Sequence, residues 1–165
     1  MNGLHSARLK PNPAGKDRSR HAVDPWQLAG EWVDIKNGGD WVLPLEGLEL
    51  YHLAYPRGGG EPGWEKVCGL TGSLAPGRVL RLHSGRSIPV SSLATQDQLG
   101  ADFHAFTGRD AYIWNNAEGD RSGLWRPSAE SWVDRASYDP DPPEGVVLER
   151  VGDKLLPMAA RARGY

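Results

Sequence analysis

The stretch GEWVDIKN, residues 30–37, decides the fold class. Its apolar Val33 and Ile35 alternate with charged Asp34 and Lys36, and this period of two is typical of a strand with one buried face. The glycine-rich GGD that follows predicts a turn between antiparallel strands. The stretch therefore predicts a strand with Val33 and Ile35 facing a core.

The same alternation recurs on both sides of this stretch. Further strands are expected at 4–10, 45–53, 78–86, 111–116, 122–127, 131–138 and 145–150. No convincing helical period appears, and residues 93–106 predict a loop or one helical turn. The pattern predicts an all-β antiparallel sandwich or barrel of seven to nine strands. Its expected core residues are Val33, Ile35, Leu48, Leu50, Leu80, Leu82, Ile113 and Val133.

Length and composition indicate one domain rich in turns. The chain has 165 residues, of which 21 are glycine and 13 are proline, a composition that favours short strands over long helices. A single cysteine, Cys68, excludes an internal disulfide and a thiolate zinc cluster; its apolar neighbours indicate a buried small side chain. Neither a signal peptide nor an apolar run of membrane-spanning length is visible, so we expect a cytoplasmic protein without a membrane span.

Six motifs occur in a familiar order along the chain. They are NPAGKDR (12–18), GEWVDIKNGG (30–39), LEGLEL (45–50), LAPGRVLRLHSG (74–85), AYIWNNAEGD (111–120) and VDRASY (133–138). This succession resembles the lamin tail domain in its bacterial form. The resemblance implies an immunoglobulin-like antiparallel β-sandwich over residues 1–150, followed by a C-terminal tail, 151–165. It also implies a protein-binding or scaffolding role. The chain departs from the compact bacterial pattern in its long inserted loops, between Tyr51 and Leu74 and at 86–110.

Charge is distributed unevenly. Residues 1–22 contain five basic residues and one acidic residue, a local charge of +4, which leaves −6 for the remainder of a chain with net charge −2. The basic residues are Arg8, Lys10, Lys16, Arg18 and Arg20. They predict either contact with nucleic acid or a solvated edge strand that resists aggregation.

Signatures of catalysis are absent from the sequence. It contains no GxSxG, Walker-type, HExxH or GxGxxG motif, so we predict a non-enzyme without catalytic residues or cofactor. His52, His83 and His104 could converge on a metal, but their spacing gives no local ligand pair. Asp17, Glu31, Asp34 and Asp120 could hold calcium, although salt bridges explain them as simply. We therefore expect no metal site.

Tryptophan is abundant, with seven residues. Most are expected in the core, while Trp32 and Trp114 fall opposite the aliphatic face and predict a covered side or a contact surface. Trp64 beside a glycine-rich loop is the expected anchor for a protein partner, together with Arg57, Trp114 and the inserted segments 56–73 and 86–110. The sequence thus predicts a non-catalytic binding module. A nucleic-acid-associated protein that uses its basic arm, and an enzyme with a scattered site, remain the alternatives.

Overall fold

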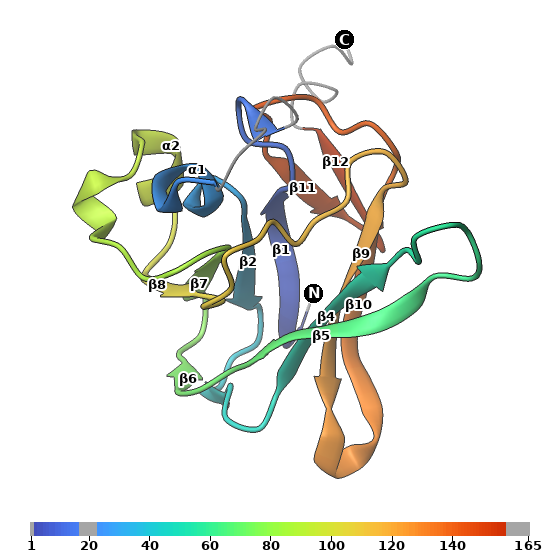
Figure 1. Ribbon diagram of the computed structural model, residues 1–165. Helices are drawn as coiled ribbons and strands as arrows, with labels where there is room; N and C mark the ends of the chain where they lie inside the picture. The colour runs from blue at the N-terminus through green and yellow to red at the C-terminus, as the bar shows by residue number, and fades with distance from the viewer. Residues whose placement is uncertain (1, 17–22, 158–165) are drawn as a thin grey trace, which may run out of the picture.

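The chain is mostly β-structure. The computed structural model describes residues 2–16 and 23–157 (Figure 1), and within them it contains twelve strands and only short helices. The strands are β1 (Leu4–Lys10), β2 (Trp32–Asn37), β3 (Leu43–Pro44), β4 (Glu49–Ala54), β5 (Gly63–Gly69), β6 (Ser73–Leu74), β7 (Val79–His83), β8 (Phe103–Phe106), β9 (Asp120–Arg126), β10 (Ser131–Tyr138), β11 (Leu148–Val151) and β12 (Lys154–Pro157). The α-helices are α1 (Pro25–Ala29) and α2 (Thr95–Gln98). None of the helices in these two ranges is long and apolar enough to cross a membrane.

Ten of the strands form one curled sheet in the order β5-β4-β9-β10-β12-β11-β1-β2-β7-β8, and β3 pairs with β6 separately. The sheet is mixed, because β10 pairs with β12 and β7 pairs with β8 in parallel. The purely antiparallel arrangement that we expected is therefore wrong at these two pairs. Curling brings β1 against β9 and β10, where the Ser6 and Ser122 hydroxyls lie 2.7 Å apart.

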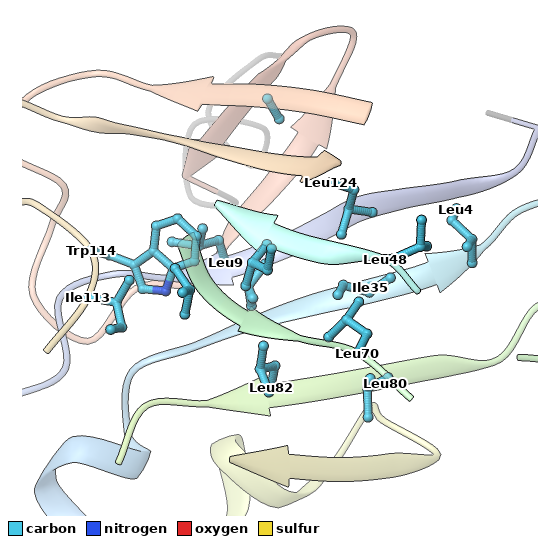
Figure 2. Packing of buried hydrophobic residues seen from close by; sticks show 14 of the residues in the cluster. Leu4, Leu9, Ile35, Leu48, Leu70, Leu80, Leu82, Ile113, Trp114 and Leu124 are labelled. Carbon is cyan, nitrogen blue, oxygen red and sulfur yellow. The ribbon is translucent and has the colours of Figure 1, made fainter. Parts of the chain in front are cut away.

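The core fills the space inside the curl (Figure 2). Seven of the eight predicted core residues are buried: Val33, Ile35, Leu48, Leu50, Leu80, Leu82 and Ile113. The eighth, Val133, is only half-buried. It packs against the core but lies where the β9–β10 register shifts between Trp132 and Asp134, and the local bend at such a bulge leaves its side chain partly exposed.

Three predictions about the position and extent of the strands need correction. Residues 4–10 form not an edge strand but an internal one, since β1 pairs with β2 on one side and β11 on the other. Residues 111–116 form no strand. The sheet also continues past the expected domain end at residue 150, because β12 pairs with β11 and β10 and buries Leu155 in the core.

The inserted segment 86–110 folds back onto the sheet. It supplies α2, the predicted helical turn, and the unpredicted strand β8 (Figure 1). Arg81 of β7 forms two hydrogen bonds with Asp34, at 2.7 and 2.8 Å, and also donates to the Asp97 and Leu99 carbonyls. Its guanidinium lies 3.6 Å from the centre of the Trp32 ring. These contacts of Arg81, which we call the Arg81 clamp, hold the segment 86–110 over the outer face of β2 and β7.

Candidate binding surface

Four aromatic rings gather on the outer side of the other half of the sheet. Tyr51 of β4, Trp64 of β5, Trp125 of β9 and Trp132 of β10 surround one another, and we call this set the aromatic face. Trp132 is central: its ring centre lies 4.5 Å from that of Trp64, 4.9 Å from that of Trp125 and 5.7 Å from that of Tyr51. All four side chains are half-buried, so each keeps part of its surface in solvent.

Strand alternation points these rings outward. Leu50 and Leu124 are fully buried, so their neighbours Tyr51 and Trp125 face the opposite side of the sheet. The β4–β5 hairpin lies beside β9 and β10 (Figure 1), and this pairing brings together rings that are far apart in the sequence.

Gly123 of β9 lies directly beneath the aromatic rings. A Cβ atom on Gly123 of β9 would lie 2.6 Å from the Trp132 ring and 3.1 Å from the Trp64 ring. Only a residue without a side chain lets both indoles lie this close to the strand. The aromatic face therefore depends on Gly123 as well as on its rings.

Charged groups border the aromatic face. Glu49 accepts hydrogen bonds from Lys66 and, at 3.2 Å, from the Tyr51 hydroxyl, and the Lys66 bond in particular lowers the pKa of Glu49. The Arg135 guanidinium lies 5.7 Å from the Trp132 ring centre. Exposed Arg121 precedes Gly123 by two residues on β9, so its side chain projects from the same side of the sheet.

The structure separates the three predicted partner-binding residues. Trp64 belongs to the aromatic face, and Arg57 is exposed in the nearby loop between β4 and β5. Trp114 is only 3% exposed and lies in the core (Figure 2). Its prediction as a surface contact is wrong, because residues 111–116 form no strand and the expected alternation of faces does not apply there.

The polar residues after Trp114 connect β4 to β9 through hydrogen bonds. The Asn115 amide donates to the Leu53 carbonyl at 2.7 Å and to Asp120 at 2.9 Å. Asp120 is buried and also accepts from the backbone amide of Leu53 and from His52. Asp120 and Glu65 raise the pKa of His52, although burial alone would lower it. The motif NNAEGD thus joins β4 to the start of β9.

The basic arm does not form a free cationic surface in the part that the structure describes. Lys10 is buried and pairs with Asp97 at 2.7 Å, and Lys16 pairs with buried Glu31 at 2.6 Å. Arg8 pairs with Asp34 at 2.9 Å. The prediction of solvent-exposed, phosphate-binding lysines is therefore wrong for Lys10 and Lys16. Arg18 and Arg20 lie outside the described residues.

The suggested metal ligands do not converge. His83 Nε2 and His104 Nδ1 lie 2.8 Å apart, but His52 pairs with Asp120 elsewhere. The carboxylates considered for calcium are each engaged by a different residue: Glu31 by Lys16, Asp34 by Arg81, and Asp120 by His52. Asp17 lies outside the described residues. Within residues 2–16 and 23–157, no three His, Cys, Asp or Glu side chains form a group that could hold a metal.

Cys68 is partly buried on β5, and burial raises the pKa of its thiol to about 11. A thiol with such a pKa is almost fully protonated at neutral pH and is a poor nucleophile. This agrees with the interpretation of Cys68 as a packing residue.

Sequence reasoning missed Tyr51, Trp125 and Trp132 as site residues. A signal was present for two of them, since Tyr51 follows Leu50 and Trp132 precedes Val133, both predicted to face inward, which places the rings outward. What the sequence did not provide was the pairing of β4 with β9, whose partners Tyr51 and Gly123 are distant in the chain. Without that pairing, the rings appear as separate surface aromatics.

Comparison with known proteins adds no assignment: no family model matches the chain, and no curated protein matches it. The function must therefore be argued from the aromatic face.

Proposed function

We propose that this chain is a non-catalytic binding module that holds a protein partner on the aromatic face. In this proposal the curled sheet is a variant of the immunoglobulin-like sandwich of lamin-tail type, and its rigid strands present the binding residues. Trp64 remains the expected anchor for the partner. Tyr51, Trp125 and Trp132 join it as partner-binding residues, and Trp114 does not.

One observation carries the proposal. Four half-buried rings from four adjacent strands lie together over Gly123, with Arg135 against the central ring. Tryptophan, tyrosine and arginine are the residues that dominate binding energy at protein interfaces, and they do so when clustered. By contrast, the outer side of β2 and β7 is covered by the chain's own segment 86–110.

Site-specific crosslinking tests this proposal. A photo-crosslinking residue at Arg135 should capture a defined protein in the native cell, because position 135 borders the aromatic face. The matched control places the same residue at Arg86, which is 70% exposed in its side chain and lies on the segment 86–110. A partner captured from 135 and lost on Trp132→Ala, at unchanged crosslinking from 86, supports the proposal. Equal capture from both positions, or none from 135, contradicts it.

A further inference from the structure

The aromatic face offers hydrogen-bond donors that have no acceptor in the described part of the chain. The indole N–H groups of Trp64, Trp125 and Trp132 make no hydrogen bond there, and none is buried, so each reaches solvent. Of the other four indoles, Trp26 donates to Ser92 and Trp32 donates to Asp97, both at 2.8 Å, whereas those of Trp41 and Trp114 make no hydrogen bond within the described residues.

The charged groups around the rings include further hydrogen-bond donors that have no ion-pair partner among the described residues. The guanidiniums of Arg121 and Arg135 form no ion pair within residues 2–16 and 23–157. The carboxylate beside the rings, Glu49, is already engaged by Lys66 and Tyr51. Around Trp132 the aromatic face thus presents ring surface and donors, while the exposed carboxylates of Glu61 and Glu118 lie in a pocket with Trp64 and Arg121.

A matching ligand needs acceptors for the indole N–H groups and apolar rings for the exposed ring surface. Proline has a carbonyl acceptor, an apolar ring and no backbone N–H. In a polyproline II helix the carbonyls point outward and are not used internally, so indole N–H groups can bind them while the pyrrolidine rings pack against aromatic side chains.

The ring geometry distinguishes proline from a nucleobase. Trp132 meets Tyr51 at an interplanar angle of 88° and Trp125 at 65°. Rings that meet edge to face in contact expose edges and ridges rather than one flat platform, whereas base binding relies on stacking against an open ring face. Small pyrrolidine rings can pack against such ridges.

A basic pocket adjoins the aromatic face. It has a volume of about 380 Å³, and its charged lining residues are Arg121, Arg135 and Lys154 with one acid, Asp153. Lys154 is already paired with Asp139 at 3.4 Å, so Arg121 and Arg135 are the basic groups of this pocket that favour an anionic group at the end of the ligand.

We propose that the aromatic face binds a proline-rich segment of a partner protein in the polyproline II conformation, with an acidic residue next to the prolines held by Arg121 and Arg135. This inference rests on the proposed function and names the class of partner. The indole N–H groups bind proline carbonyls, and the exposed ring surface around Trp132 packs against the pyrrolidine rings.

Binding of a synthetic peptide tests the inference. The probe is a fluorescent oligoproline that ends in two aspartates, compared by anisotropy with a peptide in which alanine replaces every proline. Trp64→Phe, Trp125→Phe and Trp132→Phe each keep a ring and remove one donor. Each should weaken oligoproline binding roughly threefold to tenfold, the loss expected for one hydrogen bond. The control Trp41→Phe, at a residue 79% exposed outside the aromatic face, should bind like the wild type.

A second variant tests the anionic end and does not depend on the tryptophans. Arg135→Gln should narrow the difference in affinity between the peptide ending in aspartate and one ending in asparagine. Near-ultraviolet circular dichroism and melting curves verify that each variant remains folded. Equal affinity for the proline and alanine peptides overturns the inference, as does displacement of the oligoproline by a single-stranded DNA oligonucleotide with steeply salt-dependent binding.

The two proposals fail in different ways. If Arg135 crosslinks a partner that oligoproline does not displace, the binding module stands and the proline-rich ligand is wrong. If oligoproline binds but position 135 captures no protein, the ligand chemistry stands and the proposed cellular function is wrong.

Discussion

His83 shows how a single buried residue can determine the response of this protein to acid. The side chain is fully buried, and Nδ1 donates to the Ala29 carbonyl at 2.7 Å because a carbonyl can only accept. Nε2 then accepts from Nδ1 of His104 at 2.8 Å. Both nitrogens are therefore used by the neutral ring, and a second proton on His83 would face the His104 donor. Burial is the main cause that lowers the pKa of His83 from 6.5 to about 4.

This pKa predicts a loss of stability in acid. Between pH 6.5 and about 4 the unfolded His83 binds a proton that the folded one does not, so the free energy of unfolding falls as the pH decreases through this window. The contribution is on the order of 3 kcal/mol. His83→Asn keeps a donor for Ala29 and cannot titrate, so it should be less sensitive to acid than the wild type. Denaturant unfolding at pH 7 and pH 4 measures the difference, and identical losses in both proteins would show that His83 is not responsible.

At the scale of elements, the segment 86–110 stays on the sheet through a buried polar network as well as through apolar contacts of buried Leu93 and of Ala105, which packs against the core. Leu99 and Phe103 are 66% and 53% exposed, whereas Asp97 is buried and bonds Lys10 and Trp32. Arg81 binds two carbonyls of this segment and Asp34 at the same time. Such buried networks are specific to one geometry, because every partner must be in place.

Removing the Arg81 clamp should therefore loosen the segment 86–110 from the sheet. Arg81→Met removes the bidentate partner of Asp34 and leaves only the partly exposed Arg8, among the described residues, to pair with this buried carboxylate, and breaking a buried ion pair typically costs about 3–5 kcal/mol. Hydrogen exchange at residues 95–100 should become faster, and the denaturation midpoint should fall. Arg86→Met is the matched control, because the Arg86–Asp110 pair is exposed on both sides and such pairs contribute about 0–1 kcal/mol. Unchanged exchange in Arg81→Met would mean that apolar packing holds α2.

The same elements show what sequence patterns can and cannot establish. Alternation identified β2, β4 and β7 with their inward residues, because burial of one face imposes a period of two. It did not identify β8, whose Phe103 is exposed while His104 stacks near His83. It also assigned a strand to Ile113 and Trp114, where side-chain bonds to Glu31 and Asp120, and not a ladder, fix the backbone. Such contacts join residues too distant in the chain for local patterns to reveal.

At the scale of the whole molecule, β12 connects the two halves of the curled sheet. It pairs in parallel with β10 on one side and antiparallel with β11 on the other, and β11 in turn pairs with β1. The sequence suggested a peripheral tail here, because LLP followed by basic residues carries no alternation long enough to identify a strand. The aromatic face lies on one half of the sheet, so its position relative to β1 depends on this connection.

Two neighbouring leucines of β12 allow a test of whether the sheet depends on this strand. Leu155 is 1% exposed and belongs to the core, whereas Leu156 is 36% exposed on the opposite side of the strand. Leu155→Ala should reduce the free energy of unfolding by about 2–5 kcal/mol, through lost burial and the cavity left behind. Leu156→Ala should cost less than about 1 kcal/mol, since most surface substitutions have small effects. Urea denaturation followed by tryptophan fluorescence measures both, and a chain ending at residue 150 should not fold cooperatively. Equal, small effects of the two alanine substitutions, together with a folded chain ending at 150, would show that the sheet closes without β12.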